Sequence, residues 1–101
     1  NNAGLTPAFS SVMIDLPIMP GLTEDTDAAV LFDKPEGRIV ETTAYGPVQP
    51  DTIQHFYERA LPALGWTAMP GGHYERDTEI LTFDITRDSA QSVLHISVMP
   101  Q

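Results

Sequence analysis

An aspartate and a histidine in the C-terminal third of the chain form the pair best suited to chemistry. Asp84 and His95 each lie in a segment that alternates apolar and polar residues, the pattern of a strand with one buried face. If the two segments pair as an antiparallel hairpin, the carboxylate and the imidazole face each other on the polar side. A carboxylate can orient an imidazole as a base or a metal ligand. The alternative is an exposed ion pair that stabilises the fold by roughly a few tenths of a kcal/mol.

The rest of the sequence favours the exposed ion pair. No cysteine is present, which excludes disulfides, thiolate metal sites and cysteine nucleophiles, and no recognisable motif supplies a serine nucleophile. Catalysis needs a nucleophile or base held by a second group, with donors aimed at the developing charge. We therefore expect that the protein is not an enzyme and has no assigned catalytic residue, with Asp84 and His95 as the candidate pair if a hydrolase activity exists.

The remaining acidic and histidine residues do not have metal-ligand spacing. His73, Glu75, Asp77 and Glu79 are close in sequence, but they alternate on a short strand that then turns. A specific metal site needs three or four converging ligands, and no H-x-H or H-x₃-H pattern occurs. The pair Gly71-Gly72 lacks the helix and the lysine of a phosphate-binding loop. We expect neither a metal nor a cofactor.

Composition narrows the possible partners. The 101 residues include 14 acidic and 5 basic ones, for a net charge of −9. This balance argues against nucleic-acid binding and against docking on anionic lipid through a basic patch. No apolar stretch approaches the ~18 residues of a membrane span. Because the chain begins at Asn1 rather than at Met, we expect that an N-terminal piece was removed, and such a piece could carry a signal or a lipid anchor.

Residues 1–27 differ from the rest of the chain. They contain three prolines and a polar run but no sustained period of 2 or 3.6, which predicts an extended N-terminal arm. The middle of the arm, residues 12–20, is too apolar for a free tail. We expect it to pack along the body of the protein, and the alternative is that it covers a partner.

A hairpin is predicted at the start of the body, residues 28–101, which we interpret as a single domain. Residues 28–34 and 38–45 are rich in strand formers and are joined by Pro35-Glu36-Gly37, a sequence typical of a bulged three-residue loop. We place Lys34 opposite Arg38, which sets Phe32 across from Val40 and Val30 across from Thr42.

One amphipathic helix is predicted over about residues 51–64. Asp51 is a suitable N-cap with Gln54 three residues later, and Gly65 can end the helix in the left-handed conformation. Pro62 predicts a kink or a tightened last turn. The apolar stripe has helical spacing and consists of Ile53, Phe56, Tyr57, Ala60, Leu61 and Leu64.

The remainder is predicted to be β-structure. After an extended stretch at 66–70, strands are expected at 73–76, 79–86 and 92–99, with a loop at 88–91. Apolar residues align in one register of the last hairpin: Leu81 with Val98, Phe83 with Ile96, and Ile85 with Leu94. The fold class is therefore α+β, a two-layer sandwich of one helix on a mostly antiparallel five-stranded sheet in the order ββαβββ. Leu61, Phe56, Phe83 and Ile96 are expected in its core.

Several of these segments also resemble a family of small bacterial envelope proteins. The likeness covers roughly residues 16–100 and is carried by Met19-Pro20-Gly21, by the run from Phe32 to Ile39, by Phe56-Tyr57 and by the run from Leu61 to Trp66. The resemblance implies an exported or lipid-anchored protein, periplasmic or envelope-associated, without an established activity. It implies no catalytic residue.

Two classes of function remain. The first is a non-catalytic module that binds a protein partner or forms a homodimer, through an edge strand or through the sheet face that carries Ile39, Tyr45, Ile80 and Val93. The second is a small-molecule-binding domain or a modest hydrolase that uses Asp84 and His95, with Tyr57, Trp66 and Tyr74 around a pocket. A pocket with Asp84 and His95 at its wall favours the second class.

Overall fold

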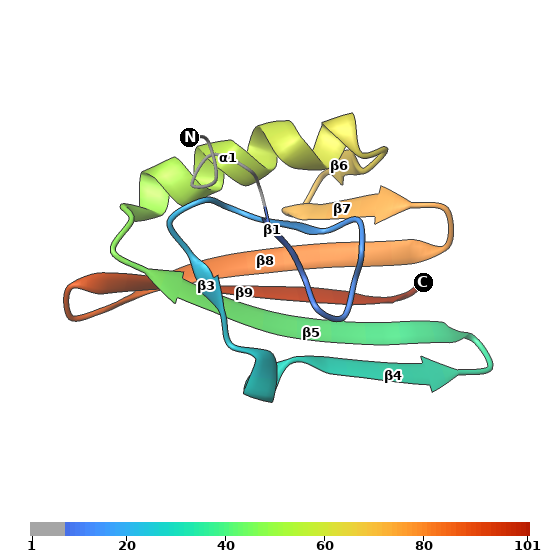
Figure 1. Ribbon diagram of the computed structural model, residues 1–101. Helices are drawn as coiled ribbons and strands as arrows, with labels where there is room; N and C mark the ends of the chain where they lie inside the picture. The colour runs from blue at the N-terminus through green and yellow to red at the C-terminus, as the bar shows by residue number, and fades with distance from the viewer. Residues whose placement is uncertain (1–7) are drawn as a thin grey trace.

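A single helix lies on one face of a curved antiparallel sheet in the computed structural model, which describes residues 8–101 (Figure 1). The described elements, in chain order, are β1 (Ala8–Phe9), β2 (Pro17–Ile18), β3 (Thr23–Glu24), a short 3-10 helix η2 (Thr26–Ala28), β4 (Val30–Lys34), β5 (Gly37–Gly46), α1 (Pro50–Ala63), β6 (Thr67–Met69), β7 (His73–Arg76), β8 (Glu79–Asp88) and β9 (Gln91–Pro100).

The main sheet has seven strands in the order β3-β5-β9-β8-β7-β6, and β4 also pairs with β5. A separate two-stranded ribbon is formed by β1 and β2. The predicted α+β class is therefore confirmed, whereas the five-stranded ββαβββ arrangement is wrong. Two short segments account for the difference. Residues 23–24 join β5, and residues 67–69, expected only as an extended stretch, pair with β7 after a tight turn through Gly71 and Gly72, which both have positive φ.

The last hairpin has the predicted register. Leu81 pairs with Val98, Phe83 with Ile96, and Ile85 with Leu94. The strands are longer than expected because Asp88 pairs with Gln91, so only two residues form the turn. The first of these turn residues, Ser89, takes the left-handed conformation that such a short connection needs.

The first hairpin has a register one residue away from the prediction. Lys34 pairs with Gly37 rather than with Arg38, so Phe32 lies across from Ile39 and Leu31 across from Val40. The physical reason is a two-residue turn at Pro35-Glu36 in place of the expected three-residue loop. A shift by one residue changes the face to which every side chain of β4 points. Phe32 therefore belongs to the face away from the helix.

Helix α1 begins at Pro50, one residue earlier than predicted. Asp51 is not its N-cap: it lies in the first turn, and the preceding Gln49 makes no side-chain capping bond. Proline suits the first helical position because its φ is already helical and its missing N–H is not needed there. The predicted C-terminus is confirmed, since Gly65 has a φ of 95° and the Trp66 N–H donates to the Leu61 carbonyl at 3.0 Å.

Pro62 is accommodated in the last turn of α1. The N–H of Leu64 donates to the Leu61 carbonyl at 3.0 Å, and the N–H of Gly65 donates to the Pro62 carbonyl at 3.1 Å. These i to i−3 bonds are the tightened last turn that the proline predicted.

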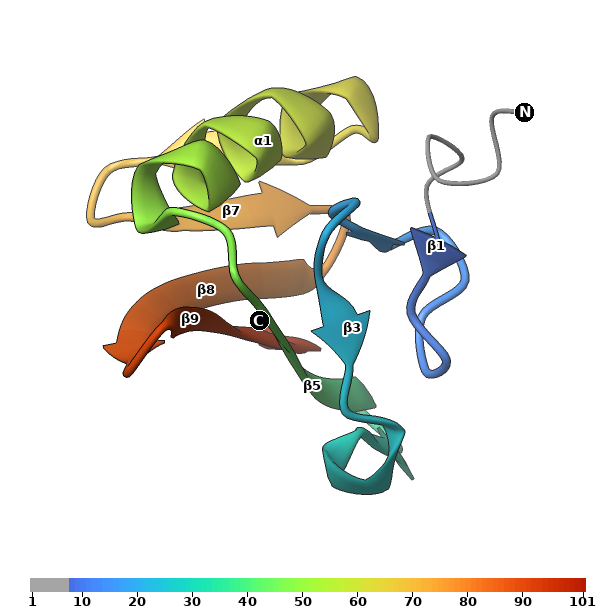
Figure 2. The same cartoon turned by 60° about the vertical axis from the view of Figure 1, so that its left-hand side comes forward.

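The N-terminal arm supplies part of the core. Met13, Leu16 and Ile18 are at most 2% exposed. Helix α1 contacts β8 and β6, and the β1–β2 part of the arm lies to one side of the helix, whereas β3 runs down to the β5 edge (Figure 2). The prediction that residues 12–20 pack on the body is therefore confirmed. The first seven residues of the predicted arm lie outside the described residues.

Two side chains of the body, from Tyr57 and Arg76, hold the arm in place. The buried Tyr57 hydroxyl donates to the Pro17 carbonyl at 2.7 Å and accepts the Met19 N–H at 3.1 Å. Burial raises the pKa of Tyr57 to about 12, so the phenol keeps its proton. Arg76 donates to Asp15 at 2.8 Å and lies 4.3 Å from the Trp66 ring centre. A third link comes from the arm itself, where the Glu24 carboxylate accepts a hydrogen bond from Thr42 of β5.

Two of the four residues predicted for the core are confirmed. Leu61 and Ile96 are buried. Phe56 and Phe83 only pack against the core and remain partly exposed, which corrects the prediction for both. Phe83 stays accessible because it borders a surface pocket.

Candidate functional site

The Asp84–His95 pair lies on the sheet face away from α1, which we call the open face. The register places the two residues directly opposite each other, as predicted. His95 Nδ1 is 3.9 Å from Asp84 Oδ1, and its Nε2 is 3.5 Å from Glu41 Oε1. Sequence reasoning missed Glu41, because the pairing of β5 with β9 cannot be read from either strand alone.

Glu41, His95 and Asp84 have the properties of an exposed ion-pair cluster. Both distances exceed those of a strong hydrogen bond, and all three side chains are accessible to water, which weakens their interactions. The two carboxylates approach opposite nitrogens of the ring, so they do not converge on one point. Within residues 8–101, no group of three or more His, Asp or Glu residues is arranged to hold a metal ion.

His95→Gln is expected to leave the fold nearly unchanged. The substitution removes one member of a water-exposed cluster, so the free energy of unfolding should change by less than ~0.5 kcal/mol. Urea denaturation monitored by circular dichroism measures the change, with Asp84→Asn as the companion variant. A loss of ~2 kcal/mol or more, or the loss of an activity present in the parent, would contradict this interpretation.

One end of the open face is apolar. Phe32 pairs with Ile39 and Ile80 pairs with Met99, and Ile39 and Met99 directly follow the terminal Val40–Val98 pair of the β5–β9 register. These four side chains form a continuous row across β4, β5, β9 and β8. The four apolar residues predicted for the uncovered face do lie on it by strand alternation, namely Ile39, Tyr45, Ile80 and Val93.

The edge strand β4 contributes Phe32 to this row, and its Leu31 points to the opposite face, as does its partner Val40. All five of its residues are exposed, and Val30, Leu31 and Phe32 have between 48% and 56% of their surface accessible. Figure 1 shows β4 at the edge of the sheet far from α1. In the part of the chain that the structure describes, β4 pairs only with β5, so its outer backbone edge has no strand partner.

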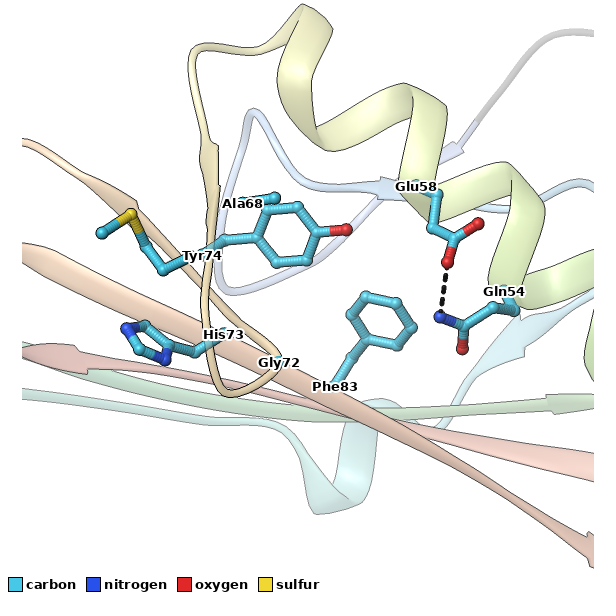
Figure 3. Close-up of a pocket in the computed structure, with 8 residues that line it drawn as sticks. Gln54, Glu58, Ala68, Gly72, His73, Tyr74 and Phe83 are labelled. Atoms are coloured by element: carbon cyan, nitrogen blue, oxygen red, sulfur yellow. Dashed lines mark hydrogen bonds between the residues drawn. The ribbon is translucent and has the colours of Figure 1, made fainter.

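A small pocket opens between α1 and the β6–β7 hairpin (Figure 3). It has a volume of about 180 Å³ and is lined by Gln54, Glu58, Ala68, Met69, Gly72, His73, Tyr74 and Phe83. All three aromatic residues predicted around a pocket belong to the core cluster, and of these only Tyr74, which is 8% exposed, also lines the pocket. Asp84 and His95 are not at its wall. The arrangement that would favour a hydrolase is therefore not the one observed.

A partly buried carboxylate lies where the arm meets the sheet. Glu24 accepts hydrogen bonds from the Ser10 hydroxyl at 2.6 Å, from the Ser11 N–H at 2.8 Å and from the Thr42 hydroxyl. Burial acts to raise the pKa of Glu24, but the bonds from Ser10, Thr42 and Ser11 outweigh it and hold the pKa below its ordinary value. Sequence reasoning missed this cluster because its donors are distant in the chain. Its contacts link the arm to β5 and point to a structural role.

Comparisons with protein-family models, with curated proteins and with solved structures found no match to this chain. None of the helices described is long and apolar enough to cross a membrane. The functional argument therefore depends on the surfaces and the pocket themselves.

Proposed function

We propose that the protein is a non-catalytic module that associates through strand β4, which pairs with β4 of a second copy. The observation that carries this proposal is the exposure of Val30, Leu31 and Phe32 on an unpaired edge. Among the exposed large apolar side chains described, these are the only ones that are consecutive in sequence. Such an edge is a template for strand addition, because its free N–H and C=O groups can continue the sheet.

The sequence of β4 is suited to pairing with itself. In an antiparallel pair centred on Leu31, that residue faces its own copy and Val30 faces the partner's Phe32. Asp33 and Lys34 then extend past the start of the partner's strand, which begins at Val30 after the 3-10 helix Thr26–Ala28, so no like charges lie opposite each other. The two-fold axis joins the sheets into one and places the two apolar rows of the open faces side by side.

Charge makes this association weak. Each copy carries a net charge of −9, so two copies repel each other at low ionic strength. We expect a dimer at high concentration and a monomer on dilution. Added salt should strengthen the dimer by screening the repulsion. Binding of a basic protein partner would instead be weakened by added salt, because salt would screen the attraction between opposite charges.

The setting proposed for this module is the bacterial envelope, periplasmic or lipid-anchored. The support is the resemblance carried by residues 32–39, by Phe56-Tyr57 and by residues 61–66. A weak edge interaction gains most in such a setting if an anchor confines the copies to a surface, because confinement raises their effective concentration.

Leu31→Lys is expected to weaken the dimer at least tenfold. In the proposed register the substitution places two lysines directly opposite each other and removes the central apolar contact. Analytical ultracentrifugation up to millimolar concentration, at low and high salt, measures the dissociation constant. The fold should be retained, since the Leu31 side chain is already half exposed.

Ile14→Lys is the matched control for this experiment. Ile14 is 89% exposed and lies in the arm, outside β4, so replacing this aliphatic residue by lysine should leave the dimer intact. A parent protein that is monomeric at millimolar concentration would refute self-association. Equal weakening by both substitutions would show that the added charge, and not the β4 edge, is responsible.

A further inference from the structure

Two aromatic rings line the pocket beneath α1. The Tyr74 and Phe83 rings are nearly parallel, with 23° between their planes and 6.2 Å between their centres. The ring centre of Phe83 is also 5.7 Å from that of the buried Tyr57, so Phe83 packs against the core. The pocket therefore offers a pre-formed aromatic surface rather than one that a ligand must assemble.

The helix places a negative charge above these rings. Gln54 donates to Glu58 Oε2 at 2.9 Å, which holds the carboxylate at the rim of the pocket. Figure 3 shows the Tyr74 hydroxyl pointing toward this rim and the Phe83 ring below the Gln54–Glu58 pair. Burial raises the pKa of Tyr74, and the charge of Glu58 raises it further, as expected for a phenol close to a carboxylate.

The pocket lining contains no permanently positive side chain that would neutralise Glu58 or repel a cation. None of the eight lining residues is Lys or Arg, and the only other titratable side chain besides Glu58 and Tyr74 is His73, whose Nε2 lies 3.1 Å from Glu75. A carboxylate beside aromatic faces is the combination that binds organic cations, because the ring faces and the carboxylate both attract positive charge.

We propose that this pocket binds a small organic cation, with its guanidinium or ammonium group over the Tyr74 and Phe83 rings and paired with Glu58. A volume of about 180 Å³ is below the ~300 Å³ at which drug-sized ligand sites begin, so the pocket has room for a head group but not for a whole drug-sized ligand. The net charge of −9 favours the approach of a cation. The site is separate from β4, so this proposal and the proposed dimer can fail independently.

The same head group can come from a free metabolite or from a basic side chain of a polypeptide. Agmatine is the probe for the first source and N-acetyl-argininamide for the second. N-acetyl-citrullinamide has nearly the same shape as the arginine probe but no charge. Titration of each into ¹⁵N-labelled protein, followed by NMR, locates binding through shifts of residues 54, 58, 72–74 and 83.

We expect both cations to shift these resonances and citrullinamide to have no effect at equal concentration. Glu58→Gln preserves side-chain size and should weaken cation binding about tenfold. Tyr74→Leu should also weaken cation binding, because it removes one aromatic ring. Tyr74→Phe should bind within about twofold of the parent. The affinity ratio of agmatine to argininamide then indicates which source the pocket prefers.

Glu36→Gln is the matched charge control, because it removes one carboxylate from the Pro35-Glu36 turn and leaves the pocket intact. It should not change cation affinity beyond about twofold. Absence of shifts at the pocket, equal binding of citrullinamide, or equal weakening by Glu36→Gln and Glu58→Gln would overturn the proposal. The last result would mean that net charge alone attracts the cation.

Discussion

Leu16→Ala is expected to destabilise the fold by about 2–5 kcal/mol, although the residue belongs to the N-terminal arm. Its side chain is fully buried in the same core cluster as Tyr57, Leu61 and Leu94. Truncation removes apolar surface from that cluster and leaves a cavity, and both effects lower the free energy of unfolding. For a domain of this size, the loss is a large fraction of total stability.

Ile14→Ala provides the control within the same segment. Ile14 is two residues away and 89% exposed, so its truncation should change the free energy of unfolding by less than ~0.5 kcal/mol. Urea denaturation of both variants measures the difference. If the two losses were equal, the arm would not be part of the core.

The C-terminal hairpin was predictable because several independent constraints agree on it. Three apolar pairs align in one register, and a shift by one residue would turn all of them to the polar face. The same alternation predicted the contact between Asp84 and His95. In contrast, Val30, Leu31 and Phe32 are consecutive apolar residues, so β4 lacks an alternating pattern that could select its register. The two-residue turn at Pro35-Glu36 sets the register of β4 instead.

The contacts of the arm could not be predicted for a different reason. Each joins residues far apart in sequence, as in the bonds of Tyr57 to Pro17 and Met19. The apolar content of residues 12–20 predicts that this segment is buried. It does not specify which side chains form hydrogen bonds with the backbone of the segment. The pocket could not be predicted for the same reason, because its lining residues come from α1, the β6–β7 hairpin and β8. Such features depend on how the elements pack.

The strand order limited what could be inferred about the open face. Alternation alone predicted that Ile39, Tyr45, Ile80 and Val93 lie there, but not which of them are neighbours. The position of β9 between β5 and β8 creates the apolar row and brings Glu41 to His95. A single strand carries no information about its neighbours beyond the hairpin to which it belongs.

Glu24 is expected to make the stability of the protein depend on pH. Its folded-state pKa lies below the ordinary value of 4.5, so the folded protein binds this proton less readily than the unfolded chain. The resulting stabilisation is fully present above pH 4.5 and is lost as the pH falls through the lowered folded-state pKa. The loss occurs because protonation weakens the acceptor for Ser10, Ser11 and Thr42.

Glu24→Gln should therefore reduce the free energy of unfolding by about 1–3 kcal/mol at pH 7, because it replaces charge-assisted bonds by neutral ones and faces an amide donor toward other donors. The difference between parent and variant should shrink below pH 4.5, since the parent then loses the same charge. Urea denaturation between pH 7 and pH 3 measures the free energy of unfolding of both proteins.

Glu36→Gln controls for net charge, because Glu36 is an exposed turn residue. The pH dependence of its free energy of unfolding should match that of the parent. A constant gap between parent and Glu24→Gln across this range would show that packing, and not the ionised carboxylate, links the arm to β5.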